Sequence, residues 1–324
     1  MKVAVTGACG HIGNNLCKEL LDQGFEVKAL LLDCEELNQP EVEVIRGNVL
    51  NPDSLISLCS DVDYVFHLAA IISIDKKDQD LVYKVNVEGT KNIVDACKAN
   101  NVKRLVHFST IHTYNPHPLD EPLDETRSQL SHTDMMYEQS KLESELIIKK
   151  AVSEGLDAVI LHPTAVFGPN DHKPSLLGQA LIKIYNNDIP MLVQGGYDWV
   201  DVRDIAKGTI DACKKGKKGE DYILSGKWMS LTDLSALIGS ITNRKTPQKT
   251  ASLFLARVGL PLIQFWATLR NEHPLYTKDT LDILKESHQD ISCKKASDEF
   301  GYSPRPTEDS LKETFDWFKQ NGMI

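Results

Sequence analysis

The chain has 324 residues, with 41% hydrophobic and 25% charged side chains, a composition typical of a folded globular protein. Its length favours one large domain with a smaller lobe over a single compact core. The formal net charge of −10 argues against nucleic acid as a partner, because an acidic surface repels phosphate backbones.

Short apolar runs alternate with helical segments in the first two-thirds of the chain. Strands are predicted at 3–6, 26–32, 42–47, 64–68, 104–108 and 158–162. Helices are predicted at 12–23, 53–59, 87–100 and 137–154. Because strands that alternate with helices form right-handed βαβ units, the pattern predicts an α/β fold, a doubly wound parallel Rossmann sheet.

A change of pattern predicts the domain organisation. After Gly168, Pro, Asn, Asp and Gly interrupt the chain and the helices become shorter. We therefore expect an NAD(P)-binding Rossmann domain at 1–167, with 195–225 returning to it. Residues 168–324 would mainly form a smaller substrate-binding lobe.

The cellular setting follows from cysteines and apolar segments. Seven scattered cysteines without a CxxC pair predict neither a disulfide framework nor a zinc site, and favour the cytoplasm. A strand that starts at residue 3 leaves no room for a signal peptide. The most apolar later stretch, 251–267, is interrupted by Arg257, Pro261 and Gln264. It predicts a buried or substrate-covering helix and no membrane span.

A glycine-rich turn joins the first predicted strand to the first predicted helix. Gly7 permits the tight turn, Gly10 lets a pyrophosphate approach the backbone, and Gly13 lets helix and strand pack closely. The helix N-terminus adds free N–H groups and a positive partial charge. The turn therefore predicts a dinucleotide site. The residues expected to contact the cofactor here are Gly7, Cys9, Gly10, His11, Ile12 and Gly13.

Asp33 lies at the end of the second predicted strand, 20 residues after Gly13. A carboxylate at this place accepts hydrogen bonds from the adenosine ribose and repels a 2′-phosphate. Asp33 therefore favours NAD, with NADP still possible. The alternative role is a loop carboxylate that caps the next helix.

Tyr137 and Lys141 form a YxxxK motif, and their i, i+4 spacing puts both side chains on one face of a helix. An ammonium group and the positive nicotinamide ring favour the phenolate, so both are expected to lower the pKa of Tyr137. Tyr137 is then the proton acceptor in oxidation and the proton donor in reduction. Lys141 is expected to hold the nicotinamide ribose as well.

Together these motifs resemble the extended branch of the short-chain dehydrogenase/reductase superfamily. The resemblance rests on the glycine turn, on YxxxK, and on the segments 63–70, 86–92, 161–169 and 198–206. It implies that Thr110 supplies the catalytic hydroxyl, with Ser109 as the fallback. Asn48 departs from the aspartate usual at the adenine edge, but its carbonyl can accept the same hydrogen bond. Further cofactor contacts implied by the resemblance are Asn48, Val49, Leu68, Ala69, Ala70, Pro163 and Val166.

The histidines do not indicate a metal, because no spacing supports one. His67 is expected to have a structural role at a strand end. His112 either borders the substrate or lies in a solvated loop.

The subgroup that the chain resembles contains dihydroflavonol-reductase-like proteins, sterol dehydrogenases and hopanoid-associated epimerases. It implies reversible hydride transfer between a nicotinamide and a secondary alcohol or ketone of a fairly apolar small molecule. The first alternative is a nucleotide-sugar epimerase or dehydratase. Such sites clamp a diphosphate with Arg or Lys. The substrate half has few arginines, and His162 replaces a frequent arginine. Those arginines are Arg203, Arg244, Arg257, Arg270 and Arg305. A second alternative is a non-catalytic NAD-binding sensor.

The resemblance also implies a homodimer. Relatives pair through two helices of each subunit, here 87–100 and 137–154. The second helix carries Leu142, Leu146, Ile147 and Ala151, more apolar residues than one stripe against the sheet requires. The alternative is that the substrate lobe covers this surface.

Overall fold

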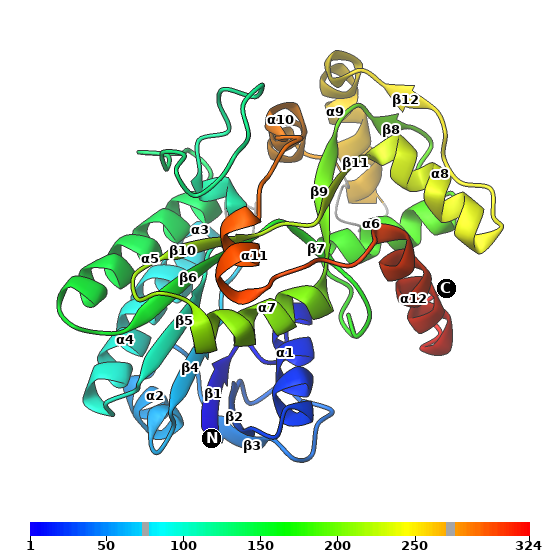
Figure 1. Cartoon of the computed structure of the whole chain (residues 1–324). Coiled ribbons are helices and arrows are strands. Elements are labelled where there is room, and N and C mark those ends of the chain that lie inside the picture. The colour runs from blue at the N-terminus through cyan, green and yellow to red at the C-terminus, as the bar shows by residue number, and fades with distance from the viewer. Residues whose placement is uncertain (73–77, 270–275) are drawn as a thin grey trace.

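The computed structural model describes residues 1–72, 78–269 and 276–324, with 262–269 described by their backbone alone (Figure 1). Seven strands form the main sheet in the order β10-β6-β5-β4-β1-β2-β3, and all neighbours are parallel. These strands are β1 (Lys2–Thr6), β2 (Glu26–Leu31), β3 (Glu43–Arg46), β4 (Tyr64–His67), β5 (Arg104–Phe108), β6 (Ala158–Pro163) and β10 (Asp221–Leu224). The predicted doubly wound fold is confirmed.

Helices cover both faces of this sheet (Figure 1). One face packs against α1 (His11–Asp22), α7 (Val202–Lys215) and α11 (Lys294–Phe300). The other packs against α2 (Pro52–Cys59), α4 (Gly89–Ala99) and α5 (Met136–Ser153). The strand order reverses between β1 and β4, so the carboxyl ends of these two strands form the crevice in which such sheets bind ligands.

A smaller lobe is built around a second apolar core (Figure 1). Its strands are β7 (Ala165–Phe167), β9 (Gly196–Asp201) and β11 (Lys227–Ser230) in one sheet, and β8 (Leu192–Val193) and β12 (Thr250–Ala251) in another. Its helices are α6 (Leu176–Tyr185), α8 (Leu231–Thr242), α9 (Leu253–Leu269), α10 (Lys278–Glu286) and α12 (Thr307–Gln320).

Two segments differ from the sequence expectations. The segment 195–225 divides between the lobes, because β9 pairs with β7 and β11 whereas α7 and β10 join the main sheet and its helix layer. The predicted helix 87–100 begins earlier, as α3 (Gln79–Tyr83) and a π-helical turn (Lys84–Glu88) lead into α4.

The apolar stretch 251–267 forms most of α9. Its described part is not simply buried, because Phe254, Leu255 and Val258 are 75%, 61% and 65% exposed. Within the described residues, every helix is too short or too polar to cross a membrane. All seven cysteines are free thiols.

Candidate active site

The glycine turn at the end of β1 closes tightly against the start of α1. Gly7 has φ +74°, and a Cβ there would lie 2.8 Å from the backbone nitrogen of Ala69. A Cβ on Gly13 would lie 2.1 Å from the Gly7 carbonyl oxygen. Any larger residue would therefore push α1 away from the strand ends, which is the close packing that a dinucleotide fold requires.

The N-terminus of α1 is left open to a ligand. Gly10 is its N-cap, and no side chain caps the first turn. The uncapped N–H groups suit a pyrophosphate. Two neighbouring side chains turn elsewhere: the Sγ of Cys9 contacts the Glu36 carbonyl at 3.5 Å, and the Nε2 of His11 bonds the Pro169 carbonyl at 3.0 Å. Any cofactor contact from Cys9 or His11 in this conformation therefore comes from the backbone.

Asp33, predicted to contact the adenosine ribose, is exposed just past β2. Asn48 is also exposed, but its Oδ1 already accepts a hydrogen bond from the Leu50 amide at 2.8 Å. Val49 is buried beneath Gly89. Sequence reasoning missed Arg46, whose Nη1 donates to the carbonyls of Leu32 and Glu35 at 2.7 and 2.6 Å. This guanidinium holds the loop that presents Asp33.

Three predicted catalytic side chains meet at the carboxyl ends of the strands. The Thr110 hydroxyl lies close enough to the Tyr137 phenol to favour its charged form. Lys141, one turn further along α5, donates from Nζ to the carbonyl oxygen of Phe108 at 2.6 Å. The hydroxyl of Ser109, the fallback residue, already donates a hydrogen bond to the carboxylate of Glu145. Thr110 is therefore the hydroxyl that faces Tyr137.

The electrostatics differ from the sequence expectation at Tyr137. Burial and the Glu138 carboxylate raise the pKa of its phenol, and only the nearby Thr110 hydroxyl opposes the rise. Burial also lowers the pKa of Lys141 to about 8, against the pull of Glu145. The expected lowering of the Tyr137 pKa by Lys141 is wrong for this structure, because the ammonium is directed at the Phe108 carbonyl. Tyr137 is therefore a protonated acid at neutral pH.

The remaining predicted cofactor residues line the same edge of the sheet. Leu68, Ala69 and Ala70 follow β4, and the Ala69 amide donates to the Thr6 hydroxyl at 3.2 Å. Pro163 ends β6, and Val166 lies in β7 against the main core.

Comparison with known proteins gives a consistent assignment. Residues 3–225 match the model of the NAD dependent epimerase/dehydratase family. A putative dihydroflavonol 4-reductase from Synechocystis sp. is 30% identical over 99% of this chain and 95% of its own. Sterol demethylase protein B from Methylococcus capsulatus is 27% identical over the full length of both chains. The crystal structure of gox2253 is 28% identical, with a TM-score of 0.86 over 99% of both chains.

The chain belongs to the NAD-dependent epimerase/dehydratase family. It is an NAD(P)-dependent oxidoreductase of the extended short-chain dehydrogenase/reductase type, as the resemblance predicts.

Sequence reasoning missed the hydrogen-bonding role of Asn86. Its amide accepts from the Ile71 amide at 2.8 Å and donates to the Ile71 carbonyl at 3.1 Å and the Ser140 hydroxyl at 2.9 Å. It ties the loop after β4 to α5, the helix of Tyr137. Asn86 lies in the π-helical turn, an irregularity that often marks functional sites.

His67 and His112, the two histidines considered from the sequence, are buried or part-buried. His67 lies between the hydroxyls of Thr6 (2.8 Å) and Thr90 (3.1 Å), which fits the structural role expected of it. Its pKa is lowered to about 3 by burial and by Lys141. His112 is part-buried, and burial lowers its pKa to about 4.

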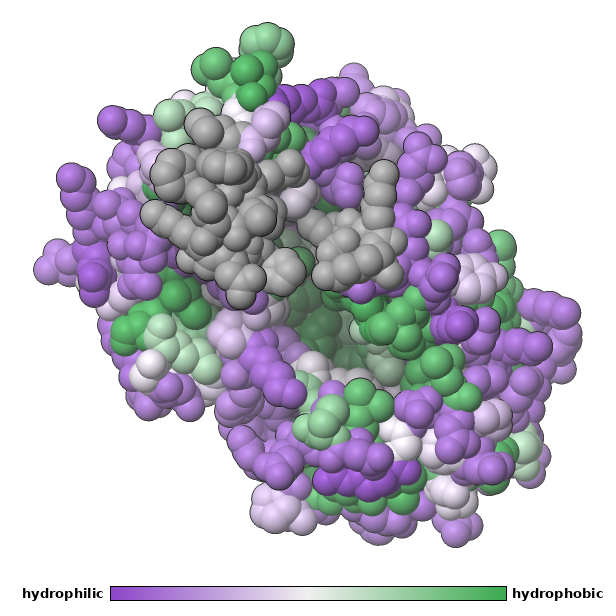
Figure 2. Space-filling view, turned by 180° about the vertical axis from the view of Figure 1, so that it is seen from behind, coloured by the Kyte–Doolittle hydropathy of each residue, from purple (hydrophilic) through white to green (hydrophobic). Residues whose placement is uncertain are grey.

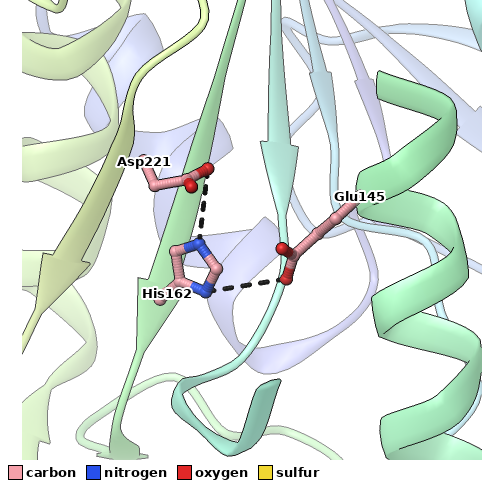
Figure 3. A group of neighbouring side chains, drawn as sticks. All are labelled: Glu145, His162 and Asp221. Carbon is pink, nitrogen blue, oxygen red and sulfur yellow. Dashed lines mark ion pairs between the residues drawn. The ribbon is translucent and has the colours of Figure 1, made fainter. Parts of the chain in front are cut away.

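A buried charged cluster was also missed, because its members come from three separate elements. It consists of Glu145 on α5, His162 on β6 and Asp221 on β10 (Figure 3). The only sequence signal was the unusual histidine before Pro163.

Proposed function

We propose that the protein reduces a ketone of an apolar small molecule, or oxidises the corresponding secondary alcohol, with Thr110, Tyr137 and Lys141 as catalytic residues. The observation that carries the proposal is that Thr110, Tyr137 and Lys141 come together at the carboxyl end of β5, on the same sheet edge as the crevice between β1 and β4. A reacting oxygen placed between the Thr110 and Tyr137 hydroxyls would receive two hydrogen bonds.

The bound nicotinamide supplies or accepts the hydride. In ketone reduction, Thr110 orients the substrate oxygen and Tyr137 donates a proton to it. The raised pKa of Tyr137 keeps the phenol protonated and therefore suits this direction. Lys141 would offer its ammonium to the nicotinamide ribose. Asp33 would hold the adenosine ribose and favour NAD over NADP.

The surroundings of Tyr137 support an apolar substrate. Met135 and Met136 precede Tyr137 and are part-buried, and Ile111 follows Thr110. Ile72, next to the loop that Asn86 holds, is 64% exposed. One face of the molecule is hollowed near its centre, and hydrophobic residues line that hollow (Figure 2). The relatives named as a dihydroflavonol reductase and a sterol demethylase protein point to the same substrate class.

The arginines do not favour a nucleotide-sugar substrate. Among the described residues after Gly168, Arg203, Arg257 and Arg305 form ion pairs with carboxylates. Arg244 lies over a tyrosine ring. Arg270 lies outside the described residues. A clamp on a diphosphate that used Arg203, Arg257 or Arg305 would have to break one of these pairs.

A turnover screen tests the proposal. Purified protein is incubated with NADH or NADPH and a panel of aryl ketones, cyclic ketones, 3-oxosteroids and UDP-sugars, with Tyr137→Phe as the control. Net oxidation of NADH by an apolar ketone is expected. Isomerisation of a UDP-sugar without net cofactor change would show an epimerase instead, and cofactor binding without any turnover would show a sensor.

A further inference from the structure

The cluster of Glu145, His162 and Asp221 lies directly beneath the catalytic hydroxyls. His162 is fully buried, with its Nδ1 3.7 Å from Glu145 Oε1 and its Nε2 3.7 Å from Asp221 Oδ1. Figure 3 shows the two carboxylates beside the imidazole ring, each facing a different ring nitrogen. Burying paired charges costs desolvation free energy, so a role for these three side chains should be sought in what they contact.

Glu145 connects the catalytic helix to the catalytic strand. Tyr137, Lys141 and Glu145 are spaced i, i+4 and i+8 on α5 and therefore share one face. The Glu145 carboxylate accepts hydrogen bonds from the Ser109 hydroxyl and from the Gln129 amide. Ser109 immediately precedes Thr110, so Glu145 sets how closely α5 approaches the end of β5.

His162 completes the connection at Thr110 itself. Its Nδ1 lies 3.1 Å from the Thr110 carbonyl oxygen, which also accepts from the Thr113 hydroxyl at 2.9 Å. The ring of Tyr114 covers the imidazole at a centroid distance of 4.9 Å. The imidazole of His162 therefore holds the backbone carbonyl of Thr110.

We propose that His162 is a positioning residue: held between Glu145 and Asp221, it fixes the backbone of Thr110 so that the Thr110 hydroxyl meets the Tyr137 hydroxyl. The inference rests on the catalytic roles proposed for Thr110 and Tyr137. In this proposal the buried charges serve to hold the catalytic residues in place. Each of the three side chains contacts β5 or an element next to it.

The charges around His162 agree with a protonated imidazole that donates to Thr110. Glu145 and Asp221 raise its pKa although burial alone would lower it. The ammonium of Lys149 lies 3.1 Å from Asp221 and 3.6 Å from Glu145. His107 on β5 has a pKa well below its usual value, chiefly through burial, and the charges of Lys141 and His162 add to the lowering.

A metal ion does not explain the three side chains as well. Both oxygens of Glu145 already accept hydrogen bonds from neutral groups. Lys149 already supplies a positive charge to both carboxylates, and a divalent cation between them would be repelled by it.

Four variants separate positioning from simple stabilisation. His162→Gln removes the charge, and His162→Arg restores a cationic donor between the carboxylates. Asp221→Asn is a milder second variant for the case that His162→Gln does not fold. The matched control is Asp157→Asn, which breaks the ion pair with Arg104 at the opposite end of the same strands (2.8 Å).

The readouts are kcat with the ketone found in the screen, the Kd for NADH, the thermal midpoint, and the NMR resonance of carbon-13 at Tyr137 Cζ, assigned with Tyr137→Phe. We expect His162→Gln to lower kcat about tenfold or more and to leave the Kd for NADH within about twofold, because small misplacements of reacting groups are costly. Its Tyr137 resonance should move as in Thr110→Val and return in His162→Arg. Asp157→Asn should lower only the thermal midpoint.

An unmoved Tyr137 resonance and an unchanged kcat in a folded His162→Gln or Asp221→Asn protein would overturn the inference. If no ketone is turned over by the wild type, the proposed function fails, and the Tyr137 resonance still decides whether His162 positions Thr110.

Discussion

At the scale of single residues, the first role to test is that of Tyr137 as the proton donor. Tyr137→Phe keeps the ring and removes the hydroxyl that meets Thr110. We expect turnover to fall at least about 10²-fold, with the Kd for NADH nearly unchanged. Steady-state kinetics and nicotinamide fluorescence measure the two effects. Tyr114→Phe is the matched control, since the buried Tyr114 hydroxyl has no hydrogen-bond partner among the residues that the structure describes. Wild-type turnover in Tyr137→Phe would end the proposed mechanism.

Cofactor preference is a second property of single residues. Asp33 is exposed, so its replacement should cost little stability. We expect the wild type to bind NADH more tightly than NADPH. The double change Asp33→Ala with Leu32→Arg should shift the preference toward NADPH by removing a repelling carboxylate and adding a cation. Fluorescence titration with both cofactors checks this, with Leu32→Arg alone as the control. Tighter NADPH binding by the unmodified protein would contradict the role of Asp33.

The pH dependence of reduction also belongs to this scale. The pKa of Lys141 is lowered to about 8, so its ammonium is present below that pH and is lost above it. We expect kcat/KM for ketone reduction to be flat near neutrality and to fall above about pH 8. Lys141→Arg, whose guanidinium stays charged, should move this fall to higher pH. A wild-type profile that stays level to pH 10 would count against a charged Lys141.

At the scale of elements, the buried ends of the strands hold an imidazole that must remain neutral. His67 on β4 has a folded pKa of about 3, against about 6.5 in an unfolded chain. Between these values the unfolded state binds the proton, so this contribution to stability is complete above about pH 6.5 and is lost as the pH falls.

The difference between the folded and unfolded pKa of His67 predicts how the free energy of unfolding changes with pH. From pH 7 to pH 5, His67 should account for a loss of about 2 kcal/mol in the free energy of unfolding. Urea unfolding at both pH values measures it. His67→Gln, which can still reach the hydroxyls of Thr6 and Thr90, should show a pH dependence smaller by that amount. Equal losses in variant and wild type would show that His67 is already charged in the folded protein.

At the scale of the whole molecule, we propose a homodimer that pairs through α4 and α5. Three of the four apolar residues that suggested a free face are used within the subunit: Leu142 and Ala151 are buried, and Ile147 packs on the core. The exposed apolar residues on this side are Leu146 (64%) on α5 and Leu81 (49%) on α3, which packs against α5.

Light scattering at micromolar concentration tests the dimer. We expect a mass twice the 36.2 kDa of one chain, because solvent-exposed leucines on paired helices gain free energy when a second copy covers them. Leu146→Glu should return the mass to one chain. Leu176→Glu changes a similarly exposed leucine (57%) on α6 in the other lobe and should leave the dimer intact. A wild-type mass of one chain would exclude the proposed pairing at that concentration.

The sequence by itself determined those features that depend on residues close together in the chain. Apolar runs alternating with helices predicted the parallel sheet, and Gly7 and Gly13 predicted the turn, because a side chain at either position would collide with backbone. The i, i+4 spacing predicted that Tyr137 and Lys141 share a helix face.

Only the tertiary structure decided which distant groups meet. It places the Ser109 hydroxyl on Glu145, which supports the proposal of Thr110 as the catalytic hydroxyl. It also raised the pKa of Tyr137 by burial, which no spacing reveals. The cluster around His162 joins one helix and two strands that are neighbours in the sheet but far apart in the sequence. Burial and long-range contacts depend on how the strands are ordered, and that order exists only in the folded chain.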